Sequence, residues 1–145
     1  MKLSRLILGA IFGIAVIAVV LMISGVVSVH RPLTAQGDAL YNAANETTVK
    51  GRVTEAQDFT CPVAEHEMGS HLMLDTAQGP IMIHLAPARV IRSQHFSFAT
   101  GDQVEIVGAK FSFHGQDGVI AREITRGNET LVIRDPGGKL LLEQQ

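Results

Sequence analysis

The chain is poor in cysteine and in aromatic residues: its 145 residues include one Cys, one Tyr and no Trp. Because a disulfide needs two thiols, the single Cys61 excludes an internal disulfide framework. It also excludes the C-x-x-C pairs of zinc ribbons and the C-x-x-C-H haem attachment sequence. We therefore expect a core of Val, Ile and Leu, supplemented by the Phe residues that follow residue 29.

Motifs of the common enzyme classes are missing as well. The sequence has no G-x-S-x-G nucleophile elbow, no H-E-x-x-H zinc motif, no phosphate-binding loop and no dinucleotide fingerprint. Cys61 lacks a base and an orienting partner at recognisable spacing. We predict that the protein is not an enzyme.

Charge is absent from residues 6–29, which form one long apolar run. At 1.5 Å per residue, a helix of this length crosses the roughly 30 Å hydrocarbon core of a bilayer. Lys2 and Arg5 precede the run, so the positive-inside rule predicts a cytoplasmic stub at residues 1–5. We predict a single-pass anchor in a bacterial inner membrane, with the rest of the chain in the periplasm. A cleaved signal is the alternative, and the length of the run disfavours it.

Within this predicted anchor, Gly9 and Gly13 form a G-x-x-x-G pair, which lets two membrane helices approach closely. They are candidate helix-packing residues, although glycine is common in membrane helices in general. The predicted partners are the lipid bilayer and a membrane protein or complex.

Beyond the predicted anchor, acidic residues outnumber basic ones. All 14 Asp and Glu follow residue 29, whereas two of the 12 Lys and Arg precede the apolar run. Binding a phosphate backbone calls for clustered cations and a positive face. The charge balance therefore predicts no nucleic-acid partner.

Three segments are expected after the anchor: a polar stalk at residues 30–47, a β-rich domain at residues 48–135 and a short tail at residues 136–145. About 115 residues suffice for one small domain with its own core. From Val49 onward, short runs of alternating apolar and polar residues are separated by Gly, Pro and Asp, which is typical of a β-barrel or sandwich.

The order of the expected elements predicts a small barrel of five to six strands. We expect residues 71–85 to form a hairpin joined by Thr76-Ala77-Gln78-Gly79-Pro80, and residues 86–99 to contain a short helix or irregular crossover. In the next strand, Ile106 and Phe111 lie on opposite phases, and a β-bulge near Gly108 would turn both toward the core. A helical crossover between the third and fourth strands is the OB-fold arrangement. We predict an all-β, OB-fold-like barrel behind the anchor.

Three segments carry a resemblance to a known family: Lys50-Gly51-Arg52-Val53, the hairpin with Leu74-Asp75-Thr76 and Gly79-Pro80-Ile81, and Gly101 to Gly108. With the predicted anchor, this order resembles the haem chaperone family of cytochrome c maturation and other small periplasmic OB-fold proteins. The resemblance implies an extracytoplasmic module that handles haem in cytochrome assembly.

The chain departs from that family at the residue that attaches haem. The family uses a His in a His-x-x-x-Tyr motif beyond the barrel. Here the only Tyr is Tyr41, in the predicted stalk, and no His follows Arg134. No residue of this chain matches the covalent haem position.

Soft and borderline metal ligands are concentrated between residues 61 and 84. If the apolar positions of the hairpin face the core, strand alternation places four of these ligands on the opposite face. Imidazole, thioether and thiolate together suit copper or haem iron, or Zn²⁺ where Met is scarce. The candidate metal or haem ligands are Cys61, His66, His71, Met73, Met82 and His84.

Two functions follow. The first is a membrane-anchored binding module that handles haem or a soft metal such as copper in cytochrome or respiratory-complex assembly. The second is a non-catalytic accessory or adaptor subunit that docks through its helix and barrel. In the second case His71 and His84 form an ordinary cross-strand surface pair, and the two Met cover apolar surface.

Overall fold

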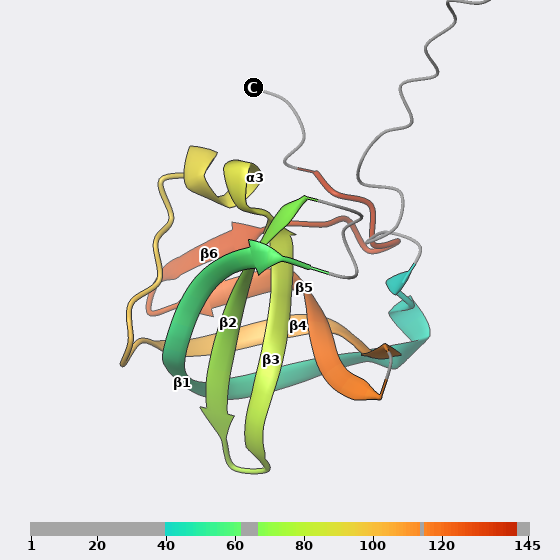
Figure 1. Ribbon diagram of the computed structural model, residues 1–145, viewed down its shortest axis with the longest axis horizontal. Coiled ribbons are helices and arrows are strands. Elements are labelled where there is room, and N and C mark those ends of the chain that lie inside the picture. Colours follow the sequence, from blue (N-terminus) through green and yellow to red (C-terminus); the bar gives the residue numbers. More distant parts are fainter. Residues whose placement is uncertain (1–39, 62–66, 114, 142–145) are drawn as a thin grey trace, which may run out of the picture. The chain divides into compact units, whose positions relative to one another are not determined.

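In the part of the chain that the structure describes, six strands and one short helix form the domain (Figure 1). The computed structural model describes residues 40–61, 67–113 and 115–141. The strands are β1 (Glu46–Thr60), β2 (Met68–Thr76), β3 (Gly79–Pro87), β4 (Gln103–Phe113), β5 (Gln116–Arg126) and β6 (Glu129–Val132). The 3-10 turn η1 (Ala43–Asn45) precedes β1, and helix α3 (Ala88–Ser93) connects β3 to β4. The predicted all-β, OB-fold-like arrangement is confirmed for these residues.

The sheet closes on itself through a parallel contact. Its strand order is β3-β2-β1-β4-β5-β6, with antiparallel pairing between neighbours, and β3 also pairs with β5 in parallel. Strand β1 is long enough to serve both halves: residues 46–52 pair with β4, and residues 51–60 pair with β2. The bend of β1 between these partners is visible in Figure 1. The closure protects the β3 edge, which would otherwise expose unpaired backbone groups.

Alternating aliphatic residues fill the barrel, as the composition predicts. Along β2 and β3, Leu72, Leu74 and Ile83 are buried in the main core cluster, and Ile81 packs against it. Helix α3 lies at one end of the barrel (Figure 1) and contributes Val90 and Ile91 to the same cluster. This packing positions the hairpin, because a slip of one residue would turn the buried set outward.

The predicted β-bulge is present, since the β4–β5 register shifts between Val107 and Gly108. Its consequence differs from the prediction. Ile106 faces the main core, whereas Phe111 packs against a second, smaller cluster that contains Ala109 and Ile120. The bulge therefore divides β4 between two apolar clusters instead of turning both sets into one.

Both ends of the barrel extend beyond the expected boundaries. Strand β1 begins at Glu46, inside the predicted stalk, and Tyr41 is buried in the second cluster. At the other end, residues of the predicted tail return to the barrel: Arg134 bridges to Leu140, which is only 4% exposed in the main core. The sequence pattern missed both segments because their buried apolar residues show no helical or strand periodicity.

The predicted anchor at residues 6–29, with Gly9 and Gly13, lies outside the described residues. Within residues 40–61, 67–113 and 115–141, no helix is long and apolar enough to cross a bilayer.

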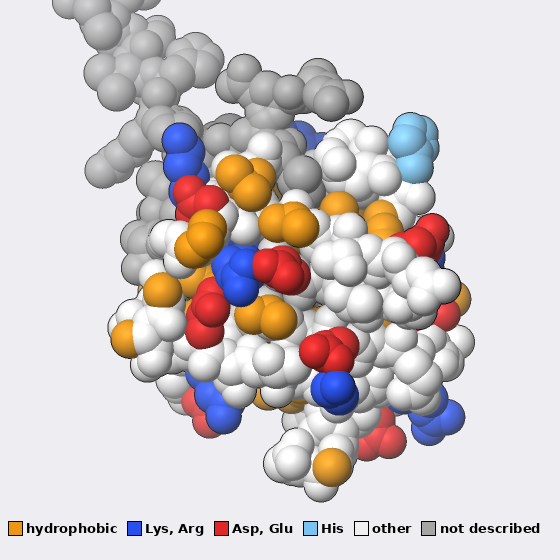
Figure 2. All heavy atoms as spheres, turned by 180° about the vertical axis from the view of Figure 1, so that it is seen from behind, with side chains coloured by type: hydrophobic (Ala, Val, Ile, Leu, Met, Phe, Trp, Pro, Cys, Tyr) orange, Lys and Arg blue, Asp and Glu red, His pale blue; other side chains and the backbone are white. Residues whose placement is uncertain are grey.

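Acidic and basic side chains lie next to one another on the face of the molecule seen in Figure 2. Several are paired. Arg122 Nε lies 2.6 Å from Glu46 Oε1, and Arg89 Nε lies 2.7 Å from Glu67 Oε1. Both pairs are only partly exposed. Surface ion pairs contribute about 0–1 kcal/mol each, so the fold depends mainly on the apolar clusters.

Substitution of Gly108 tests the structural role of the β-bulge. A Cβ at this position would lie 2.3 Å from the Ile120 carbonyl oxygen and 2.8 Å from Val119 Cγ1. We expect Gly108→Ala to lower the free energy of unfolding by about 1–3 kcal/mol, since the backbone of β5 must shift. Urea unfolding followed by circular dichroism measures this. Gly137→Ala is the control, because its Cβ would meet only Asp135 Oδ1, at 3.3 Å. Equal effects of the two substitutions would contradict the account of the bulge.

Candidate metal centre

The β2–β3 hairpin places two histidines and two methionines on one face, as the sequence pattern predicts. His71 pairs with His84 and Met73 pairs with Met82, while the residues between them, Leu72 and Ile83, point into the barrel. The register depends on the short Ala77-Gln78 turn, because Thr76 pairs directly with Gly79. This is the β2–β3 face that OB-folds commonly use for ligands.

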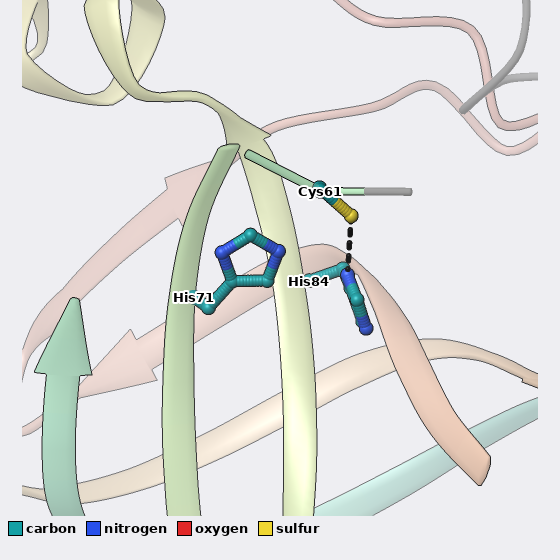
Figure 3. Close-up of side chains that lie close together, drawn as sticks. All are labelled: Cys61, His71 and His84. Carbon is teal, nitrogen blue, oxygen red and sulfur yellow. Dashed lines mark hydrogen bonds between the residues drawn. The ribbon is translucent and has the colours of Figure 1, made fainter. Parts of the chain in front are cut away.

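Cys61 joins this face at the end of β1. Its Sγ lies 3.3 Å from His84 Nδ1, the contact drawn in Figure 3. One ligand atom each from Cys61, His71 and His84 lie within 4.8 Å of one another. Cys61 and His71 are 3% and 2% exposed, and His84 is half-buried. We call these three residues the Cys-His-His centre.

Phenylalanine side chains hold the two imidazoles in place. The ring of Phe59 stacks on His71 with centroids 3.8 Å apart, and Phe111 meets His84 edge-on at 4.9 Å. His71 and His84 themselves meet edge-to-face at 4.6 Å. Sequence reasoning missed Phe59 and Phe111 as parts of the centre. The only available signals were the position of Phe59, two residues before the lone cysteine, and the phase shift that places Phe111 after the bulge.

Both imidazoles are kept neutral by their surroundings. Burial, together with smaller effects of the neighbouring His71 and the Arg134 cation, lowers the pKa of His84 to about 4. Burial also lowers the pKa of His71, against smaller opposing effects of the Gly69 backbone and Asp58. A neutral imidazole retains a lone pair for a metal, so little proton competition is expected at neutral pH.

The burial of His71 leaves one polar atom unsatisfied. His71 Nδ1 is buried and has no hydrogen-bond partner in the structure. Buried nitrogen atoms in native proteins are generally paired, and exceptions occur at functional sites. A residue that served only to fill the face would avoid this cost as Leu or Phe.

The spacing of the centre fits a single metal ion. With metal–sulfur bonds of about 2.3 Å and metal–nitrogen bonds of about 2.0 Å, ligand atoms around one metal lie roughly 3.3–3.8 Å apart. The Cys61–His84 separation is already 3.3 Å, and small side-chain rotations bring the remaining separations, none above 4.8 Å, into this range.

A groove of about 480 Å³ adjoins the centre along the same face. His84, Met73 and Met82 line it, together with Phe59, Phe111 and Phe113. Met73 and Met82 thus share the groove with His84. The remaining candidate, His66, lies outside the described residues.

The strand order and this site define an OB-fold protein with a buried Cys-His-His centre. The chain belongs to the MamS/MamX magnetosome protein family, which matches residues 45–131. No curated protein matches the chain in sequence.

Solved structures of other proteins share the fold. The Schizosaccharomyces pombe Stn1–Ten1 complex is 13% identical, with a TM-score of 0.46, over 58% of this chain and 59% of that chain. The single-stranded DNA binding protein from Thermus aquaticus is 15% identical, with a TM-score of 0.45, over 59% of this chain and 41% of that chain. The second OB-fold domain of replication protein A from Methanococcus maripaludis is 19% identical, with a TM-score of 0.42, over 59% and 87%. This chain thus spans less than two thirds of the first two. The likeness concerns the fold.

One prediction is corrected by these structures. The charge balance predicts no nucleic-acid partner, and this exclusion is wrong, because the similar solved structures include single-stranded DNA binding proteins. Net charge describes the whole surface, whereas an OB-fold binds single strands through a local groove and stacking side chains.

The neutral histidines predict a pH dependence of stability. From pH 6.5 down to about 4, the unfolded chain protonates His84 while the folded chain keeps it neutral, so stability falls as pH falls. Each such imidazole contributes a slope of up to about 1.4 kcal/mol per pH unit. We expect the urea midpoint to decrease between pH 6.5 and pH 5, and the double variant His71→Gln/His84→Gln to lose most of this decrease. An unchanged slope in the double variant would show that the imidazoles are not buried as neutral groups.

Proposed function

We propose that this protein binds one copper ion, as Cu(I), through Cys61, His71 and His84. The observation that carries the proposal is the convergence of three ligand atoms within 4.8 Å on one buried face. When Cu(I) binds, the Cys61 thiol gives up its proton to solvent and the sulfur becomes a thiolate ligand, while both imidazoles bind as neutral groups.

The geometry favours a single metal ion over haem. Haem iron accepts protein ligands at its two axial positions, on opposite faces of the porphyrin. In this centre three donors approach one another, and the His71 and His84 rings are in edge contact at 4.6 Å. A porphyrin plane would have to separate these rings.

The donor set favours copper over zinc. A trigonal site of two His and one Cys, with a Met nearby, is a typical copper environment. Structural zinc sites have four protein ligands, commonly with two or more Cys. Here the groove beside the centre is lined by Met73 and Met82, whose thioethers suit Cu(I).

Membership of a magnetosome protein family supports an accessory or assembly role. This agrees with the second function inferred from the sequence, and the two functions are compatible: an accessory protein that carries copper. The predicted membrane anchor, the periplasmic location and the absence of catalysis stay predictions.

Copper titration of the full-length protein tests the proposal. Under anaerobic reducing conditions, in competition with the chelator bicinchoninate, we expect one Cu(I) per chain. Cys61→Ser should weaken Cu(I) binding by at least about 100-fold. Mutating a residue that only hydrogen-bonds to a metal ligand already lowers metal affinity by about 10–100-fold. The matched control is His95→Asn, which removes an exposed histidine outside the centre.

Three results would contradict the proposal: no copper uptake, an unchanged affinity in Cys61→Ser, or an equal loss in His95→Asn. Stoichiometric binding of Zn²⁺ that excess Cu(I) does not displace would overturn the choice of copper. Circular dichroism of each variant confirms that the fold is retained.

A further inference from the structure

The groove adjoins the Cys-His-His centre at His84. Of the three donors of this centre, Cys61 and His71 are buried, whereas His84 is half-buried and lines the groove of about 480 Å³. The same groove is lined by Met73 and Met82, both of which are half-buried. His84 is therefore the residue of the centre that faces the groove, and the buried Cys61 and His71 lie behind it.

Met73 and Met82 face each other one step along the hairpin from the histidine pair. They pair across β2 and β3, as His71 and His84 do, and each is two residues from the histidine of its own strand. Directly opposite side chains in a sheet have Cβ atoms about 5 Å apart, and two residues along a strand span roughly 6.6 Å. The flexible Met side chains can therefore bring both sulfurs to one ion and can also approach an ion held by His84.

The chemistry of the groove selects a soft ion. Thioether sulfur is a neutral, soft ligand that binds Cu(I) without releasing a proton. The aromatic walls formed by Phe59, Phe111 and Phe113 offer no competing lone pair. Gln116 and Asp117 also line the groove, but oxygen ligands suit Cu(I) poorly.

We propose that Met73 and Met82 form a transfer site for Cu(I), which holds the ion transiently and exchanges it with His84 of the copper centre. This inference rests on the proposed copper function. Transfer involves ligand exchange only: copper stays Cu(I), two copper–sulfur bonds to Met break as bonds to His84, His71 and Cys61 form, and the Cys61 proton leaves to solvent.

Stopped-flow exchange of Cu(I) between the full-length protein and bicinchoninate tests the transfer site. The variant is Met73→Leu/Met82→Leu, which conserves volume and should keep the fold. We expect uptake and release both to slow by about tenfold while the equilibrium affinity stays within about threefold, because the thioethers act on the path and not in the final site. Phe113→Leu is the control: it changes the same groove without removing a soft donor.

Rates equal to wild type in the double variant would overturn the transfer site, and so would a similar slowing in Phe113→Leu. A large loss of affinity with unchanged uptake would also overturn it, since the Met would then be ligands of the centre. A wild-type protein that takes up no copper contradicts the proposed function itself, whereas normal binding with unaltered rates contradicts the transfer site alone.

Discussion

The pairing of His71 with His84 across β2 and β3 is the constraint on which the candidate site depends. The register of this pairing is fixed by the residues on the opposite, core-facing side of the sheet. Leu72, Leu74 and Ile83 are buried in the barrel, and a slip of one residue would expose all of them. Burying a side chain of this size is worth about 1.5–3 kcal/mol, so the register is held by far more energy than any contact between the two imidazoles.

On the outer face of this hairpin, neighbouring side chains shield the two histidines from solvent. Phe59 covers His71, Phe111 meets His84, and Cys61 lies against both imidazoles. Burial keeps the imidazoles neutral and leaves His71 Nδ1 without a partner, which makes the metal-free face costly. A metal ion that binds only the folded chain would offset part of this cost, because binding free energy adds to folding free energy.

The sequence predicted those features that depend on local periodicity. Alternation in residues 71–85 was enough to pair the histidines, and the change of phase between Ile106 and Phe111 located the bulge at Gly108. Features that depend on single long-range contacts were not predictable in this way. Tyr41 and Leu140 are buried by segments without a repeating pattern. Phe59 reaches His71 because β1 pairs with β2, where Phe59 is opposite Gly69 and diagonal to His71. The same alternation grouped Met73 and Met82 with the histidines, and both Met line the groove together with His84.

The most direct test of the account is X-ray absorption spectroscopy at the copper edge on the Cu(I)-loaded, full-length protein. The account predicts a first shell of one sulfur at about 2.2–2.3 Å and two imidazole nitrogens at about 2.0 Å, with the multiple-scattering pattern of histidine rings. Loss of the sulfur contribution in Cys61→Ser would assign it to that thiolate. A shell of oxygen ligands, or of sulfur alone without imidazole scattering, would contradict a centre built from Cys61, His71 and His84.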